Sequence, residues 1–164
     1  MRRSHAAKAI GGAVLLPVLV VAWWLASPLF LSTTVVEGLP PSTDGEALPT
    51  GTVTKHGALR DGDSFHKGSG QVAVYRAPEG SHFLRLENIN VTNGPDLYVF
   101  LSTHPNPSNQ QEVYTSGYVN LGKLKGNVGS QTYVLPPDTD PGQLRSVVVY
   151  CLAFHVVFSV ASLQ

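Results

Sequence analysis

The sequence predicts an all-β protein: an antiparallel β-sandwich of about eight short strands, preceded by one N-terminal transmembrane helix. Three observations lead to this prediction. Residues 10–31 form an uncharged, largely apolar run. After residue 50, short apolar runs alternate with turn residues, a pattern typical of strands. No stretch after residue 50 keeps a helical period of apolar residues over three turns, so helices are not expected there.

The N-terminal segment has the length and charge pattern of a membrane anchor. Residues 1–9 are a short basic tail, with Arg2, Arg3 and Lys8 ahead of the apolar run. A run of this length can cross a hydrocarbon core of about 30 Å, at about 1.5 Å per helical residue. The positive-inside rule places the tail in the cytoplasm and the C-terminal domain outside it. We therefore expect a single-pass protein of the cell membrane, with the lipid bilayer as a partner. A cleavable signal peptide and a buried soluble helix stay open as alternatives.

The segment after the apolar run, residues 32–50, is rich in Pro, Gly, Ser, Thr and acidic residues. This composition is typical of a flexible linker. Residues 51–164 then form a single extracytoplasmic domain. Its expected strands, in chain order, are residues 71–76, 82–87, 90–92, 97–102, 112–115, 131–135, 145–152 and 154–159.

Two of these strands are apolar on both faces, within residues 97–101 and 147–152. Strands covered on both sides are central strands, so we expect these two in the middle of the domain. The apolar parity changes between Cys151 and Phe154. A bend or bulge near residues 152–153 would explain this change.

Composition and motifs exclude several classes of function. The formal net charge is zero and no basic patch stands out, which argues against nucleic acid as a partner. Neither a hydrolase motif nor a phosphate-binding loop is present. The protein is therefore expected to be a redox or binding module more than a turnover enzyme.

Cys151 is the only cysteine, so the chain cannot form an internal disulfide. One interpretation is a small buried hydrophobe in a central strand. The other is a redox thiol or a ligand to a metal or haem, which needs a cation, a histidine or a metal nearby. His66, His104 and His155 would be the partners of a metal site if the fold brought them together. In a straight strand, however, Cys151 and His155 would be about 13 Å apart, too far for one metal ion.

Four segments carry a resemblance to a known family: residues 64–70, 84–102, 117–129, and 147–151 together with 154–161. The more specific parts are Gly-Pro-Asp-Leu-Tyr-Val at residues 94–99 and Leu-Gly-Lys-Leu-Lys-Gly-Asn at residues 121–127. In order and spacing, these segments resemble the DM-thirteen domain, a DOMON-associated family with an electron-transfer label. The resemblance covers residues 51–163.

The resemblance implies an all-β fold and a redox role centred on the family cysteine, which matches Cys151. That cysteine would act as a bare thiol or as a ligand to a prosthetic group, so haem and metal stay open as cofactors. His66, Asp96 and Tyr98 fall on family motif positions and are candidate cofactor-binding residues. The sequence departs from the family where Tyr150 and Ser130 replace a common Trp and a common acid.

The function predicted from the sequence is therefore a membrane-tethered extracytoplasmic redox domain centred on Cys151, with a membrane redox partner. The alternative is a non-catalytic binding or adhesion module of the cell surface in which Cys151 is a structural, buried residue.

Overall fold

The computed structural model describes residues 17–21, 23, 31–38 and 51–164. The chain divides into two compact units, Met1–Leu31 and Ser32–Gln164. In the first unit, residues 17–21 and 23 are helical.

The predicted membrane anchor and localisation need correction. Among the residues that the structure describes, no helix has both the length and the apolar character needed to cross a membrane. This finding contradicts the transmembrane helix predicted over residues 10–31 and the single-pass localisation derived from it. Most of that range lies outside the described residues.

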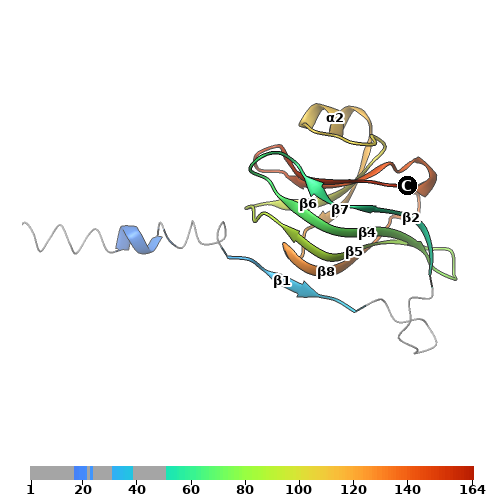
Figure 1. The fold of residues 1–164 in the computed structure, drawn as a ribbon, viewed down its shortest axis with the longest axis horizontal. Helices are drawn as coiled ribbons and strands as arrows, with labels where there is room; N and C mark the ends of the chain where they lie inside the picture. Colours follow the sequence, from blue (N-terminus) through green and yellow to red (C-terminus); the bar gives the residue numbers. More distant parts are fainter. Residues whose placement is uncertain (1–16, 22, 24–30, 39–50) are drawn as a thin grey trace, which may run out of the picture. The chain divides into compact units, whose positions relative to one another are not determined.

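The second unit contains two five-stranded sheets (Figure 1). The first sheet has the order β1 (Thr34–Val36), β8 (Val128–Val134), β5 (His82–Val91), β4 (Gly68–Arg76) and β2 (Thr52–Ala58). The second sheet has the order β3 (Arg60–Asp61), β10 (Val156–Ser162), β9 (Ser146–Cys151), β6 (Leu97–Ser102) and β7 (Tyr118–Lys123). A short helix, α2 (Gln110–Thr115), and a 3₁₀ turn, η1 (Pro141–Gln143), complete the elements described.

The two sheets do not form the simple antiparallel sandwich of about eight strands that the sequence predicted. The chain passes from β2 in one sheet to β3 in the other with only Leu59 between them. The backbones of His56 and Gln164 exchange hydrogen bonds of 3.1 and 2.9 Å, which joins the two sheets along this edge. In addition, β1 runs parallel to β8. The fold is still mostly β, but its sheets are connected at one side and one of its strand pairs is parallel.

Residues 112–115, predicted as a strand, belong to helix α2. The side chain of Asn109 caps the helix by accepting a hydrogen bond of 3.0 Å from the backbone N–H of Glu112. The Glu112 carboxylate in turn accepts one of 2.7 Å from the backbone N–H of Ser108. Such reciprocal capping satisfies N–H groups that a short helix would otherwise leave unpaired. Only Val113 of the helix is buried, so the helix has no long apolar period for a sequence pattern to detect.

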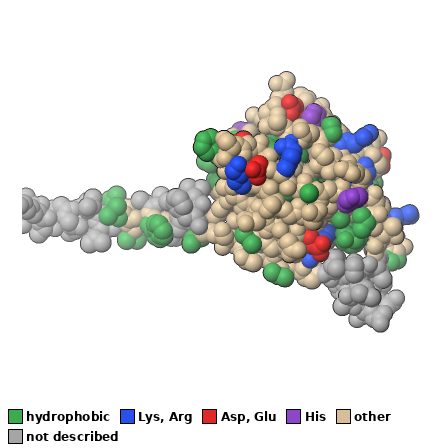
Figure 2. Space-filling view, viewed as in Figure 1, with side chains coloured by type: hydrophobic (Ala, Val, Ile, Leu, Met, Phe, Trp, Pro, Cys, Tyr) green, Lys and Arg blue, Asp and Glu red, His purple; other side chains and the backbone are tan. Residues whose placement is uncertain are grey.

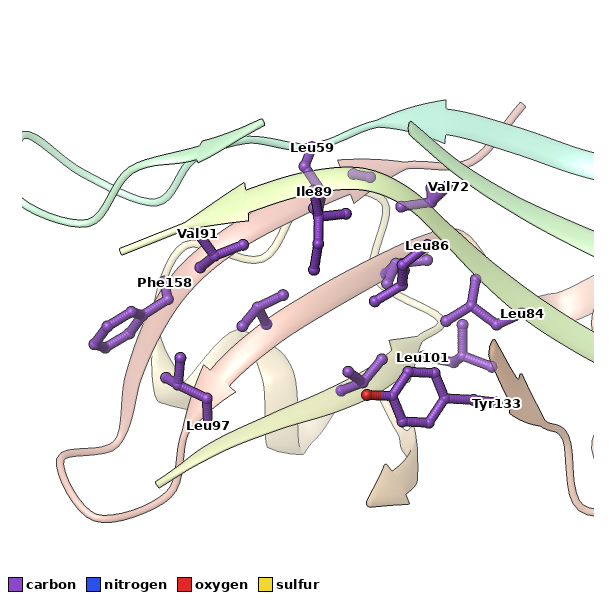
Figure 3. Packing of buried hydrophobic residues seen from close by; sticks show 14 of the residues in the cluster. Leu59, Val72, Leu84, Leu86, Ile89, Val91, Leu97, Leu101, Tyr133 and Phe158 are labelled. Carbon is purple, nitrogen blue, oxygen red and sulfur yellow. The ribbon is translucent and has the colours of Figure 1, made fainter. Parts of the chain in front are cut away.

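The apolar core lies between the sheets (Figure 3). Strands β6 and β9 are interior strands of the second sheet, as their two-faced apolar pattern predicted. Along β9, Val147, Val149 and Cys151 belong to this main core. Their neighbours Val148 and Tyr150 belong to a second cluster, which includes Val113 of α2. The second sheet is therefore covered on both faces.

Candidate functional site

Cys151 is the last residue of β9 and is 0 % exposed. Its cross-strand neighbours are Leu97 on β6 and Val156 on β10. The four residues that follow, 152–155, form the turn between β9 and β10, which replaces the bend predicted near residues 152–153. Cys151 and His155 thus lie on a tight hairpin and not along a straight strand. The thiol is fully buried, yet only the half-buried Leu152 separates Cys151 from the exposed turn residues 153–155.

His66 lies in the loop between β3 and β4 and pairs with Asp63. The Asp63 Oδ2 atom is 2.7 Å from Nδ1 of His66, and Oδ1 accepts hydrogen bonds from the backbone N–H groups of Phe65 and His66, each 2.7 Å long. These contacts, the His66 side chain first, lower the pKa of Asp63 to about 2. The His66 ring also lies 4.1 Å, centroid to centroid, from the ring of Phe158 on β10. His66 is therefore held in place by a carboxylate on one side and an aromatic ring on the other.

His66 and Cys151 lie toward the same end of the domain, but apolar side chains lie between them. A Cβ atom at Gly94 would come within 2.9 Å of both Leu97 and Phe158. These two side chains therefore pack against the Gly94 backbone, and Figure 3 shows both at one end of the core. Phe158 contacts His66 and Leu97 is the neighbour of Cys151. The described contacts thus link imidazole and thiol only through hydrophobic side chains.

Asp96 and Tyr98 meet at Lys123 on β7. The Asp96 Oδ1 atom is 3.1 Å from Nζ of Lys123, and this nitrogen is 5.7 Å from the centroid of the Tyr98 ring. The pKa of Lys123 is raised, chiefly by its hydrogen bond to Asp96. The carbonyl oxygen of Asp96 accepts a hydrogen bond of 3.0 Å from the N–H of Leu152. Asp96 therefore fastens the turn beside Cys151, whereas Tyr98 packs against the second cluster, on the face away from the thiol.

The surroundings of Cys151 do not fit a haem or a metal ion. The carbonyl of His104 bonds to Ser146, which is five residues from Cys151 along β9 and therefore about 16 Å away. Within the described ranges, no group of three or more His, Cys, Asp or Glu side chains is placed to hold a metal ion. The side chain of Cys151 is enclosed in the apolar core, which leaves no open position at its sulfur for a ligand bond of about 2.3 Å.

The structure adds an aromatic layer that the sequence did not predict. The Tyr150 ring stacks on Phe100 at 5.3 Å and meets the edge of Tyr114 at 5.9 Å, and Tyr114 contacts Tyr118 at 5.0 Å. The Tyr150 hydroxyl is buried with no hydrogen-bond partner among the described residues. Its pKa is raised, first by burial and then by the Tyr114 side chain. The alternation of Tyr98 and Phe100 on β6, with Tyr150 on β9, was a usable signal, but assigning Tyr114 to a strand concealed it.

Charged side chains form local pairs more than patches of one sign. Figure 2 shows Lys and Arg side chains close to Asp and Glu side chains on the face in view. Ion pairs include Lys67–Asp61, Lys123–Asp96 and Lys125–Glu37.

Comparison with known proteins places these features in a family. Residues 61–163 match the family described as Electron transfer DM13. The chain belongs to the DM13 family. The match covers more than half of the chain and includes all four residues that the sequence resemblance singled out: His66, Asp96, Tyr98 and Cys151. None of the curated proteins and none of the solved structures matches the chain. An electron-transfer-related role follows from the family description.

Proposed function

We propose that this DM13 domain takes part in electron transfer through the thiol of Cys151 itself, without a haem or a metal at that residue. The observation that carries the proposal is the position of Cys151 at the end of β9, next to the turn of residues 152–155, of which residues 153–155 are exposed. The family description supports the reaction class. The enclosed apolar surroundings of the sulfur favour a bare thiol over a cofactor ligand.

The thiol becomes reactive only when the end of the hairpin opens. Strand ends open at a lower free energy than strand centres. Opening here breaks the hydrogen bond between Leu152 and Asp96 and separates Cys151 from Val156. The core side chains Val149 and Val147 can stay packed. Local opening therefore exposes the thiol without unfolding the domain.

Thiol–disulfide exchange with a disulfide-bearing partner is the reaction that a single exposed thiol supports. The Cys151 thiol loses its proton to solvent, and the thiolate attacks one sulfur of the partner disulfide. A new S–S bond forms while the old one breaks, and its electron pair leaves with the second partner sulfur as a thiolate. Attack of that thiolate on the mixed disulfide reverses the exchange. Attack by an external thiol on the Cys151 sulfur leaves the partner reduced by two electrons and the external thiol in a new mixed disulfide.

The alternative is a non-catalytic binding module in which Cys151 serves only packing. The observation that favours it is the complete burial of the side chain among hydrophobic neighbours. Free cysteines are often buried in this way as small hydrophobes.

Labelling kinetics separate the two functions. The rate at which a low-molecular-weight disulfide modifies Cys151 is compared with the global opening rate from amide exchange of β6. The matched control moves the thiol two residues inward on the same face of β9, as Val149→Cys in a Cys151→Ser background. We expect Cys151 to react at least tenfold faster than the thiol at position 149, with weak dependence on denaturant. Equal rates that both follow global unfolding would refute the redox proposal and support the packing role.

A further inference from the structure

Residues 32–38 lie along the edge of β8, inside the range that the sequence predicted to be a flexible linker. That part of the linker prediction is wrong, because this segment contributes strand β1 to the first sheet. The register is parallel, with Thr34, Val35 and Val36 opposite Val128, Gly129 and Ser130. The ladder continues on either side, from Val128 N–H to the Thr33 carbonyl at 3.2 Å and from Glu37 N–H to the Ser130 carbonyl at 2.8 Å.

Asn127 fixes the start of the segment. Its Oδ1 atom accepts a hydrogen bond of 2.7 Å from the backbone N–H of Thr33, and its Nδ2 atom donates one of 3.3 Å to the hydroxyl of Ser32. The same Nδ2 atom donates to the Val91 carbonyl at 3.0 Å. Because Asn127 is only 6 % exposed and tied to β5, it forms a prearranged contact for an incoming backbone.

The end of the segment is bound through a carboxylate and two carbonyls. The Glu37 carboxylate lies 2.7 and 3.0 Å from Nζ of Lys125 and accepts a hydrogen bond of 2.8 Å from the N–H of Thr132. Arg85, 5 % exposed, donates to the Glu37 carbonyl at 2.8 Å and to the Gly38 carbonyl at 3.3 Å. Charge-assisted contacts of this kind are about twice as strong as neutral hydrogen bonds.

Two glycines make room for the segment's backbone. A Cβ atom at Gly129 would overlap the carbonyl oxygen of Val35, and φ at this glycine is +108°. A Cβ atom at Gly126 would lie 2.6 Å from the carbonyl oxygen of Thr33. The edge of β8 is therefore shaped to receive a strand at close approach.

The segment itself adds little to the core. Thr34 and Val36 are exposed, Val36 by 81 %, and Val35 is only half-buried. The residues that hold the segment, Arg85, Lys125, Asn127, Gly129 and Thr132, all lie inside the family match, whereas the segment lies outside it. Polar and backbone contacts thus attach residues 32–38 to a domain whose core is built without them.

We propose that the β8 edge is a binding site for an extended peptide with a carboxylate at the position of Glu37, filled in this chain by residues 32–38. Recognition follows the strand-addition mode, in which main-chain hydrogen bonds provide affinity and side-chain contacts provide specificity. Lys125, which pairs with the Glu37 carboxylate, supplies the specificity for the acidic residue, and Arg85 holds the backbone through the carbonyls of residues 37 and 38. Because the site holds its own segment in cis, a peptide in trans must compete with an effective concentration in the millimolar range.

The test detaches the cis segment and returns it as a separate peptide. In the full chain, Val35→Pro removes a backbone N–H in the middle of β1, and Glu37→Lys places a cation against Lys125 and Arg85. The probe is the synthetic peptide Ser-Thr-Thr-Val-Val-Glu-Gly of residues 32–38, and the control peptide carries Lys in place of Glu. Amide NMR shifts of Ser130 and Thr132 report binding, and amide exchange of β6 and β9 reports the integrity of the core. Glu79→Lys, on the turn after β4, is the matched control for the charge change.

We expect the double variant to keep the protection of β6 and β9 and to bind the peptide at least tenfold more tightly than the wild-type chain or the Glu79→Lys variant. The Lys-containing peptide should not bind. Two outcomes would overturn the proposal. One is loss of protection in β6 and β9 when the segment detaches, which would make β1 an integral strand. The other is a folded, detached variant that shows no shifts with millimolar peptide.

Discussion

The substitution Tyr150→Phe tests whether the aromatic layer contains a polar group that the fold leaves unsatisfied. Leaving a buried hydroxyl without a hydrogen bond costs about 1–3 kcal/mol. No partner lies within hydrogen-bond distance of the Tyr150 hydroxyl among the described residues, although the Tyr114 side chain is close enough to help raise its pKa, so removing the hydroxyl recovers part of that cost. The vacated volume offsets part of the gain, at about 24 cal/mol per Å³ of cavity. We expect the variant to be more stable by about 1 kcal/mol in urea unfolding near neutral pH.

The matched control is Tyr133→Phe, the same chemical change at a hydroxyl that is bonded. Tyr133 donates toward the Lys123 carbonyl and the Gln131 Oε1 atom, at 3.1 and 2.7 Å, and accepts from the N–H of Lys125 at 3.1 Å. Removing this hydroxyl takes a donor from the Lys123 carbonyl, whereas the Lys125 N–H stays bonded to the Gln131 Oε1 atom at 2.9 Å, so we expect a loss of about 1 kcal/mol. Opposite signs for the two variants are the required result. If Tyr150→Phe destabilises the domain as much as Tyr133→Phe does, the hydroxyl of Tyr150 has a partner and the reasoning is refuted.

The stability difference between the wild type and Tyr150→Phe should also depend on pH. The pKa of Tyr150 is raised in the folded state, mainly by burial, relative to about 10 in the unfolded chain. A raised pKa contributes stability that is present below pH of about 10 and is lost as the pH rises further. Tyr150→Phe lacks this loss, so its advantage over the wild type should grow above pH of about 10. A constant difference across that range would show that the phenol also ionises when folded.

Three further predictions concern the elements around the site. Asp63→Asn should remove an acid-sensitive contact. The pKa of Asp63 is lowered from its ordinary value of 3.8 to about 2, so the carboxylate contributes to folding stability above pH 3.8, and this contribution fades as the pH falls toward 2. The gap between wild type and variant in urea midpoint should therefore close on acidification, and a gap that does not change with pH would contradict this. Gly94→Ala should cost about 1–3 kcal/mol because its Cβ would crowd Leu97 and Phe158; thermal unfolding measures it, and a neutral result would mean that the two side chains can move aside. Asn109→Ala should cost about 1 kcal/mol through loss of the α2 cap, with amide exchange increasing first at Glu112 and Val113, and unchanged exchange there would refute the capping role.

The parts of the fold that were predictable are those that a local pattern determines. The runs at residues 97–102 and 146–151 are apolar on both faces, and both proved to be interior strands. β1 was missed because it has only three residues and is stabilised by distant partners, such as the ion pair of Glu37 with Lys125, 88 residues later. Helix α2 was mistaken for a strand because caps stabilise it more than any apolar period does.

For the candidate site, the sequence identified the residue types but not their surroundings. The sequence named His66 as a partner of Cys151 in a metal site only if the fold brought the two together, and the structure places Phe158 and Leu97 in the contacts between them. No local pattern reports this, because packing at Gly94 brings together side chains from β6 and β10. For Asp96, the sequence indicated a turn residue. The structure adds that its carbonyl accepts a hydrogen bond from the N–H of Leu152, a distant partner that a turn signal could not specify.

For the proposed redox role, the position of Cys151 along its strand matters more than its burial does. Val149 and Cys151 are both 0 % exposed and face the same core, so exposure alone cannot distinguish a reactive site from an inert one. They differ in what must open before solvent reaches them. Reaching Val149 requires separation of β9 from both neighbours over several residues, whereas Cys151 is followed directly by the turn held by Leu152 and Asp96. The substitution Asp96→Pro keeps the acceptor carbonyl, distorts the backbone that presents it and removes the contact with Lys123. The control Asp96→Asn weakens the contact with Lys123 but leaves the backbone and its carbonyl in place. If the thiol acts by local opening, the Pro variant should accelerate labelling of Cys151 at least tenfold with little change at position 149, and the Asn variant should not.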